Sequence, residues 1–161
     1  MNQRNPGHGW IEILGYRVYI GAVGFKGSSR IVAEAYSSMS SECKEEAVVA
    51  GLKGTPASQC ALAVAFIHAL EGRFRGSRIK NLSILFIMEL YGFRQVNQVV
   101  EHVRDVDYIA LLSLRPECIE EGYKRLLELG VEGEYLGLRE CDPRELSRLV
   151  TRSVRHGVRL E

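Results

Sequence analysis

The cysteines of the chain lack the spacing of a metal-binding or redox motif. There are four of them, Cys43, Cys60, Cys118 and Cys141. No two stand in a Cys-x-x-Cys arrangement, which argues against a zinc knuckle and against a thioredoxin-like dithiol. Because disulfides are rare in intracellular proteins, we expect reduced thiols, mostly buried, in a cytosolic protein.

Long apolar runs are also missing. The longest one, residues 82–91, contains Ser83 and Glu89 and is too short to span a bilayer. The first nine residues, MNQRNPGHG, are polar and lack the apolar segment of a signal peptide. We therefore expect a soluble, cytoplasmic protein with no membrane contact.

Common catalytic motifs are absent as well. The histidines have no His-Glu-x-x-His or similar ligand spacing, no Gly-Lys-Ser/Thr follows the glycines at 21, 24 and 27, and no Gly-x-Ser-x-Gly occurs. His68 lies in an apolar segment, where a core or boundary position is the commoner role. The expectation is a protein that is not an enzyme, with no catalytic residues, no metal and no cofactor.

An excess of one charge is missing from the whole chain but present in one segment. The 161 residues carry a net charge of +1, with 46% hydrophobic and 25% charged residues, as in one ordinary globular domain. Residues 73–100 carry a local charge of +4, five cations less Glu89 (5 − 1). The cations are Arg73, Arg75, Arg78, Lys80 and Arg94. Such a run is often a solvated loop, but cations beside aromatic rings and amides also suit single-stranded nucleic acid.

The first half of the chain predicts strands and then helices. Residues 1–9 are expected to form a loose tail, and residues 10–25, rich in β-branched and aromatic side chains, predict one or two strands. A short helix is expected over 30–36. Serine caps and early carboxylates predict a helix over 40–52. Pro56 precedes an apolar segment, 57–72, that predicts a central helix.

The second half predicts alternating helices and strands. Periodicity does not tell whether 82–91 is a buried strand or a buried helix, but its Leu, Met and Glu favour a helix. There follow a helix over 94–104 with four valines on one face, a strand over 107–114, a helix over 116–129, a short strand over 131–138 and a final helix over 143–157. This order predicts a single α/β (α+β) domain over residues 1–161, with several helices packed on a small mixed sheet.

The predicted C-terminal helix has two contrasting faces. One carries Arg144, Arg148, Arg152, Arg155 and Arg159, and the opposite one Leu146, Leu149, Val150 and Val154. This pattern is typical of an amphipathic surface helix. It also suits a phosphate-facing stripe or a surface that binds a protein partner.

The stretch IKNLSILFIMELYGFRQVNQVVEHV, residues 79–103, resembles the signature of the PRPK-binding protein family. This family is the small subunit of the KEOPS complex in archaea and eukaryotes. Its pattern is a polar pair, an apolar helix, a small-residue turn with Gly-x-Arg-Gln-Ile, and a second helix. The pair corresponds to Lys80-Asn81 and the turn to residues 92–96. The layout is similar over roughly 10–150, whereas the specific resemblance covers 79–103.

The chain departs from the family pattern in three places. Leu85 stands where relatives usually carry Glu, and Tyr91-Gly92 stands where the turn is often Ser-Gly. The C-terminal helix is richer in arginine than is usual in the family. The first departure leaves the role of Glu89 open, and the last leaves the kinase-facing contact open.

The resemblance implies a non-catalytic subunit, of the archaeal type, in a complex that makes threonylcarbamoyladenosine on tRNA. Such a subunit binds the N-lobe of an atypical kinase and recruits tRNA through its 3′ CCA end. The candidate tRNA-binding residues are Arg78, Lys80, Asn81, Tyr91, Gly92, Arg94, Gln95, Val96 and Asn97. The candidate kinase-binding residues are Leu149, Val150 and Val154.

On this hypothesis the apolar segment 82–91 anchors the turn at Gly92, and a helix N-terminus with free N–H groups then draws in a phosphate. Arg94 pairs with the phosphate, Gln95 and Asn97 read base or ribose edges, and Tyr91 or Phe93 stacks on a base. Two alternatives stay open. One is a scaffold or kinase regulator without RNA contact, and the other is an unrecognised α/β domain that binds a small molecule.

Overall fold

A computed structural model describes the protein from Gly9 to Leu160, and its side chains up to Thr151. Its centre is a four-stranded sheet in the order β1-β2-β4-β3. The strands are β1 (Gly9–Ile13), β2 (Tyr16–Ser28), β3 (Ala47–Leu52) and β4 (Asp105–Ser113). The α/β (α+β) class, with several helices on a small sheet, is confirmed. The sheet itself is antiparallel in all three described pairs, and in this respect the expectation of a mixed sheet is corrected.

The first two strands confirm the prediction for residues 10–25. They form a hairpin whose turn is Leu14-Gly15, with φ values of 52° and 84°. Two successive positive φ angles suit the twist of a two-residue hairpin. Gly9 already belongs to β1, so the expected loose tail ends before it, and the rest of that tail lies outside the described residues.

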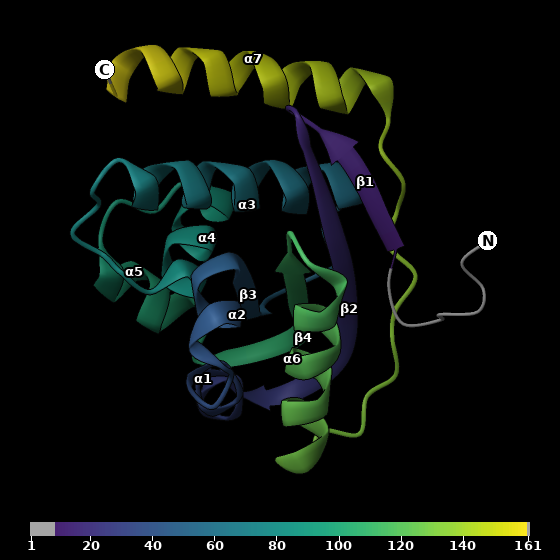
Figure 1. Ribbon diagram of the computed structural model, residues 1–161. Coiled ribbons are helices and arrows are strands. Elements are labelled where there is room, and N and C mark those ends of the chain that lie inside the picture. The colour runs from purple at the N-terminus through teal and green to yellow at the C-terminus, as the bar shows by residue number, and fades with distance from the viewer. Residues whose placement is uncertain (1–8, 161) are drawn as a thin grey trace.

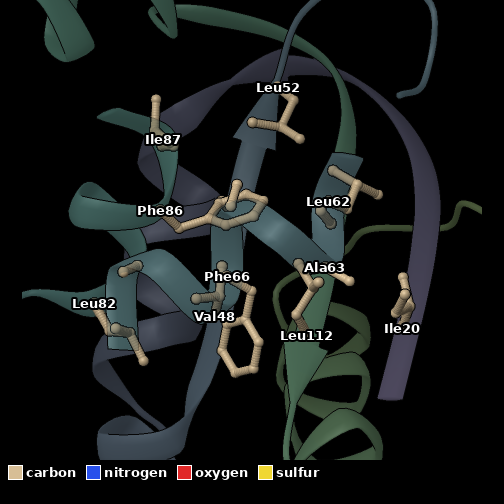
Figure 2. Packing of buried hydrophobic residues seen from close by; sticks show 14 of the residues in the cluster. Ile20, Val48, Leu52, Leu62, Ala63, Phe66, Leu82, Phe86, Ile87 and Leu112 are labelled. Carbon is tan, nitrogen blue, oxygen red and sulfur yellow. The ribbon is translucent and has the colours of Figure 1, made fainter. Parts of the chain in front are cut away.

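Helices cover both faces of the sheet (Figure 1). On one face lie α3 (Gln59–Phe74), α4 (Leu82–Tyr91) and α5 (Val96–His102), and on the other α1 (Ser29–Ser37) and α6 (Pro116–Glu128). The larger core lies under α3 and α4. There Phe66 and Phe86, both fully buried, lie among strand side chains such as Val48 and Leu112 (Figure 2).

The C-terminal helix α7 (Pro143–Leu160) lies alongside α3 and runs in the same direction (Figure 1). Its predicted range was 143–157, so the helix is longer by three residues. The predicted helices over 30–36, 82–91 and 116–129 and the strand over 107–114 are confirmed as α1, α4, α6 and β4.

Residues 40–52 are not one helix. The serine cap begins a short helix, α2 (Ser41–Glu46), and the chain then forms β3. All six residues of β3 are buried. A strand buried on both faces is a continuous apolar run and shows no alternation of apolar and polar residues. Its sequence can therefore be taken for a continuation of the preceding helix.

The strand predicted over 131–138 is reduced to an isolated bridge between Tyr135 and Val23. β1 pairs only with Tyr16–Ile20 along this edge of β2, and the bridge lies just beyond the end of that pairing. The Leu136 N–H donates to the carbonyl of Ala22 at 2.7 Å, which holds the segment there.

Two further helix boundaries differ from expectation. α3 begins after Ser58, whose Oγ accepts the N–H of Ala61, so Pro56 precedes the helix. α5 begins at Val96 and buries only Val99, with Val103 buried just after it, whereas Val96 and Val100 are exposed. The four valines therefore do not form one buried face.

The expectation of reduced cysteines is wrong for this structure. Cys43 is bonded to Cys118 and Cys60 to Cys141. The partners stand 75 and 81 residues apart in sequence, so no local spacing reveals them. Only the fold brings α2 onto α6 and the segment before α7 onto the first turn of α3. Over the described residues, no helix combines the length and the apolar composition needed to cross a membrane.

Candidate nucleic-acid interface

The helix α4 is anchored along its length. Its side chains Leu82, Phe86 and Ile87 are buried in the larger core. The hydroxyl of Ser83 accepts the N–H of Val49 at 3.1 Å, so α4 also satisfies a backbone donor of β3, the strand at the end of the sheet. Both ends of α4 are therefore held in fixed positions against the sheet.

Two of the predicted site residues form the ends of this helix. Asn81 is the N-cap, and its Oδ1 accepts the N–H of Ile84 at 3.0 Å. Gly92 is the C-cap in the left-handed conformation, with φ of 77°. The N–H groups of Gly92 and Phe93 both donate to the carbonyl of Met88. The turn that the sequence placed at Gly92 is thus observed.

The residues after Gly92 form an exposed polar segment. Arg94, Gln95, Val96 and Asn97 are all exposed. Over the described part of the chain, no hydrogen bond or ion pair engages the guanidinium of Arg94. This cation stands on a rigid turn without an intramolecular counter-charge, which is the property expected of an anion-binding side chain.

The helix N-terminus does not offer all the free donors that the sequence suggested. The Oε1 of Gln98 accepts the N–H of Arg94 at 2.8 Å and the N–H of Gln95 at 2.9 Å. This is the reciprocal half of a capping box. The expectation of free N–H groups is therefore wrong at these two residues, and the attraction for an anion rests on the Arg94 side chain.

Tyr91 is half-buried and is held by contacts within the protein. Its ring stacks on Phe93 at 5.5 Å between centroids and lies 4.3 Å from the ring of His102. Its hydroxyl accepts the N–H of Lys53 at 3.2 Å, and burial raises the pKa of this phenol. Through these contacts Tyr91 holds the turn at Gly92 in place. Phe93 is half-buried as well and belongs to the same aromatic cluster.

The predicted tRNA-binding residues are not all brought together. Arg78, Lys80 and Asn81 precede α4, whereas Gly92, Arg94, Gln95, Val96 and Asn97 follow it. A helix of ten residues separates the two groups by about 15 Å. We call the first group the α4 entrance and the second the α4 exit.

Two residues near the exit were not predicted from the sequence. His102 contributes a ring to the aromatic cluster, and its buried Nε2 has no hydrogen-bond partner over the described residues. Lys53 approaches from the end of β3. His102 was only one of four scattered histidines, and Lys53 is brought near by a strand that the sequence did not predict.

The candidate kinase-binding residues lie on α7, whose first half is fixed to the protein. Leu149 is half-buried and packs against the larger core, and Val150 is half-buried. Val154 lies outside the described side chains. The buried hydroxyl of Ser58 donates to Glu145 Oε2 at 2.9 Å, and the bond between Cys60 and Cys141 lies beside it. Part of the apolar stripe thus serves the protein's own packing.

Within residues 9–151, no group of three or more His, Cys, Asp or Glu side chains is arranged to hold a metal ion. His68 does contact Glu89, with 3.6 Å between Nδ1 and Oε1 across α3 and α4. Compared with known protein families and with curated protein sequences, the chain matches none.

Proposed function

We propose that the protein is the small, non-catalytic subunit of an archaeal KEOPS complex. In this role it binds the atypical kinase subunit through α7 and recruits tRNA through the 3′ CCA end at the α4 exit. The proposal is supported by the resemblance over residues 79–103. The observation that carries it is the exposed, unpaired guanidinium of Arg94 on a turn fixed by a buried helix.

The position of Arg94 has no evident use within the fold. It stands just before Gln95, the N-cap of α5, where the helix dipole does not favour a cation. No acidic residue pairs with it over the described residues. An external phosphate accounts for a cation at this place, because a charge-assisted bond at a rigid position loses little side-chain freedom on binding.

The exit also offers the other groups that an unpaired RNA end needs. Gln95 and Asn97 are exposed amides, and Phe93 presents a half-buried ring. Single-stranded RNA is recognised by stacking and by hydrogen bonds to base edges and ribose hydroxyls. A 3′ end, which is free of base pairing, fits this set of groups.

The disulfides bear on the cellular location. Intracellular proteins of hyperthermophilic archaea are often disulfide-rich, unlike those of most other cells. An archaeal cytoplasm is therefore compatible with the two bonds and with the assignment to a tRNA-modifying complex.

An electrophoretic mobility-shift assay tests the proposal directly. The purified chain should retard intact tRNA and should retard tRNA without its 3′ CCA much less. It should also co-purify with the kinase-like subunit. Kinase binding without any shift of tRNA would favour a protein-only scaffold, and absence of both would leave the small-molecule domain.

A further inference from the structure

The side chain of Phe74 is the most exposed large apolar side chain in the described part of the molecule. It is 72% exposed, against 59% for Val100 and 49% for Trp10. Phe74 is the last residue of α3, a helix that is otherwise mostly buried. Phenylalanine at such a position adds nothing to the core, so its ring is available to a partner.

Three free cations follow Phe74 in the chain. Arg75, Arg78 and Lys80 are exposed, and no hydrogen bond or ion pair engages their side chains over the described residues. Residues 72–88 contain no Asp or Glu. Arg73 is different, because its guanidinium donates to the carbonyls of Lys44 and Glu45 and so caps the end of α2.

The loop that carries these cations is held by its own backbone. The N–H groups of Arg75, Gly76 and Ser77 donate to carbonyls of the last turn of α3. Gly76 turns the chain with φ of 91°, and the hydroxyl of Ser77 accepts the N–H of Ile79. Asn81 then caps α4. The ring and the charges are thus presented from a defined loop between two anchored helices.

The backbone of α7 runs toward the same end of the molecule. α7 runs beside α3 in the same direction, so its last turns lie toward the end of α3 that carries Phe74 (Figure 1). Residues 151–160 of α7 include three arginines and no acidic residue. The charge at this end is mixed, because Glu71 stands on the last turn of α3 and the end of α2, with Glu45 and Glu46, contacts Arg73.

We propose that Phe74, Arg75, Arg78 and Lys80 form a second RNA contact, in which the ring stacks on an unpaired base and the cations bind the flanking phosphates. Proteins that bind single-stranded RNA use an aromatic side chain among cations. Such a ring can stack on any of the bases. Only the identification of the bound RNA as tRNA rests on the proposed function. The Lys80 end of the contact, beside the start of α4, lies about 15 Å from the exit along the ten residues of that helix.

A membrane surface is the competing partner for a basic, aromatic patch. The neighbours of Phe74 do not favour it, because the loop after it reads Arg-Gly-Ser-Arg and offers no second apolar side chain before Ile79. Interfacial binding needs a continuous apolar face. One ring on a polar loop fits a base better than a bilayer.

The test compares Phe74→Ala, Phe74→Tyr and the parent by fluorescence anisotropy, with two probes. These are a fluorescein-labelled single-stranded oligoribonucleotide and tRNA without its 3′ CCA. Phe74→Ala should lower affinity by about 5- to 100-fold for both, the range of a lost base–aromatic stack, and Phe74→Tyr should restore it. Val100→Ala, which removes another exposed apolar side chain, is the matched control and should bind like the parent.

The result that overturns this inference is equal binding by Phe74→Ala and the parent, or an equal loss in Phe74→Tyr. Phe74-dependent binding to phosphatidylserine vesicles without binding to either RNA overturns it as well and identifies a membrane site. Failure of the proposed function looks different, because the parent would then fail to distinguish tRNA with and without its 3′ CCA. Phe74-dependent binding of the oligoribonucleotide remains measurable in that case.

Discussion

At the residue scale, Tyr91 connects the proposed RNA-binding turn to the sheet. Its hydroxyl is hydrogen-bonded to the end of β3 through Lys53, and its ring packs with Phe93 and His102. A rigid support of this kind lets the neighbouring Arg94 project without a partner of its own. Residues around a binding site often act by holding the residues that touch the ligand.

A second buried phenol makes stability depend on pH. Burial raises the pKa of Tyr108 to about 12 from 10.0, and its hydroxyl accepts the N–H of Ala57. The neutral phenol of Tyr108 therefore stabilises the folded protein fully below pH 10, the pKa of the group in the unfolded chain. This stabilisation is lost as the pH rises from 10 toward 12. Tyr108→Phe should therefore flatten the alkaline loss of unfolding free energy, by about 2 to 3 kcal/mol at most.

Urea denaturation at several pH values between 8 and 12 measures this effect. At neutral pH the variant should be less stable by about 1 to 2 kcal/mol, because the N–H of Ala57 loses its acceptor. Parallel curves for the variant and the parent above pH 10 would contradict the assigned role of Tyr108.

Gly133 is required by a close approach of two chain segments. A Cβ atom there would overlap the carbonyl oxygen of Gly24 in β2. Gly133→Ala should cost about 1 to 3 kcal/mol of unfolding free energy, as overpacking usually does. Gly137→Ala is the matched control, since nothing lies within 4 Å of the added atom. Equal stability of the two variants by urea denaturation would argue against this contact.

At the element scale, α7 is tied to α3 at its beginning. Cys141, Glu145 and Leu149 hold its first two turns through a disulfide, a hydrogen bond and core packing. Removing the whole helix would uncover α3, so point changes test the kinase contact more cleanly than truncation does.

Val150→Asp should lower the affinity for the kinase-like subunit by roughly tenfold or more, which is the effect of changing an interface hot spot. Leu149 packs against the larger core and Val150 is not among the side chains that do, so the unfolding free energy should change by less than for Leu149→Ala. Ser147→Asp, an exposed site on the same helix, controls for added charge. Isothermal titration calorimetry with the kinase-like subunit measures the effect. Unchanged affinity of Val150→Asp would show that α7 does not contact the kinase-like subunit at Val150.

The elements differ in how far the sequence predicts them. α4 was predictable because its Leu- and Met-rich composition and the glycine after it favour a helix with a defined end. β3 was not predictable, because a fully buried strand does not alternate apolar and polar residues. It also directly follows a segment whose sequence favours the start of a helix. The Arg94 turn could be placed from local sequence, whereas the Gln98 cap and the contact with Lys53 depend on the fold.

At the scale of the whole molecule, the two disulfides cross-link segments far apart in the chain. They close loops of 75 and 81 residues, and loop-closure entropy for such lengths corresponds to roughly 4 to 5 kcal/mol each. The loops overlap in sequence, so the two contributions are not expected to add fully. These long-range bonds were beyond prediction from the sequence, because scattered cysteines do not indicate their partners.

Reduction should therefore lower the melting temperature markedly. Calorimetry with and without dithiothreitol measures the change, and thiol titration under denaturing conditions without reductant should find no free cysteine. Cys43→Ser with Cys118→Ser then isolates one bond. Four titratable thiols together with an unchanged melting temperature would contradict the paired state.

The most direct test of the proposed function is binding of tRNA by Arg94→Glu. Replacing the phosphate contact by a repulsive carboxylate should weaken binding of intact tRNA on the order of 100-fold, and the difference should shrink at high salt. On tRNA without its 3′ CCA, the variant and the parent should bind alike. Lys124→Glu, an exposed site on α6 across the sheet, controls for bulk charge. If Arg94→Glu binds intact tRNA like the parent, or loses no more affinity than Lys124→Glu, the α4 exit does not receive the tRNA end.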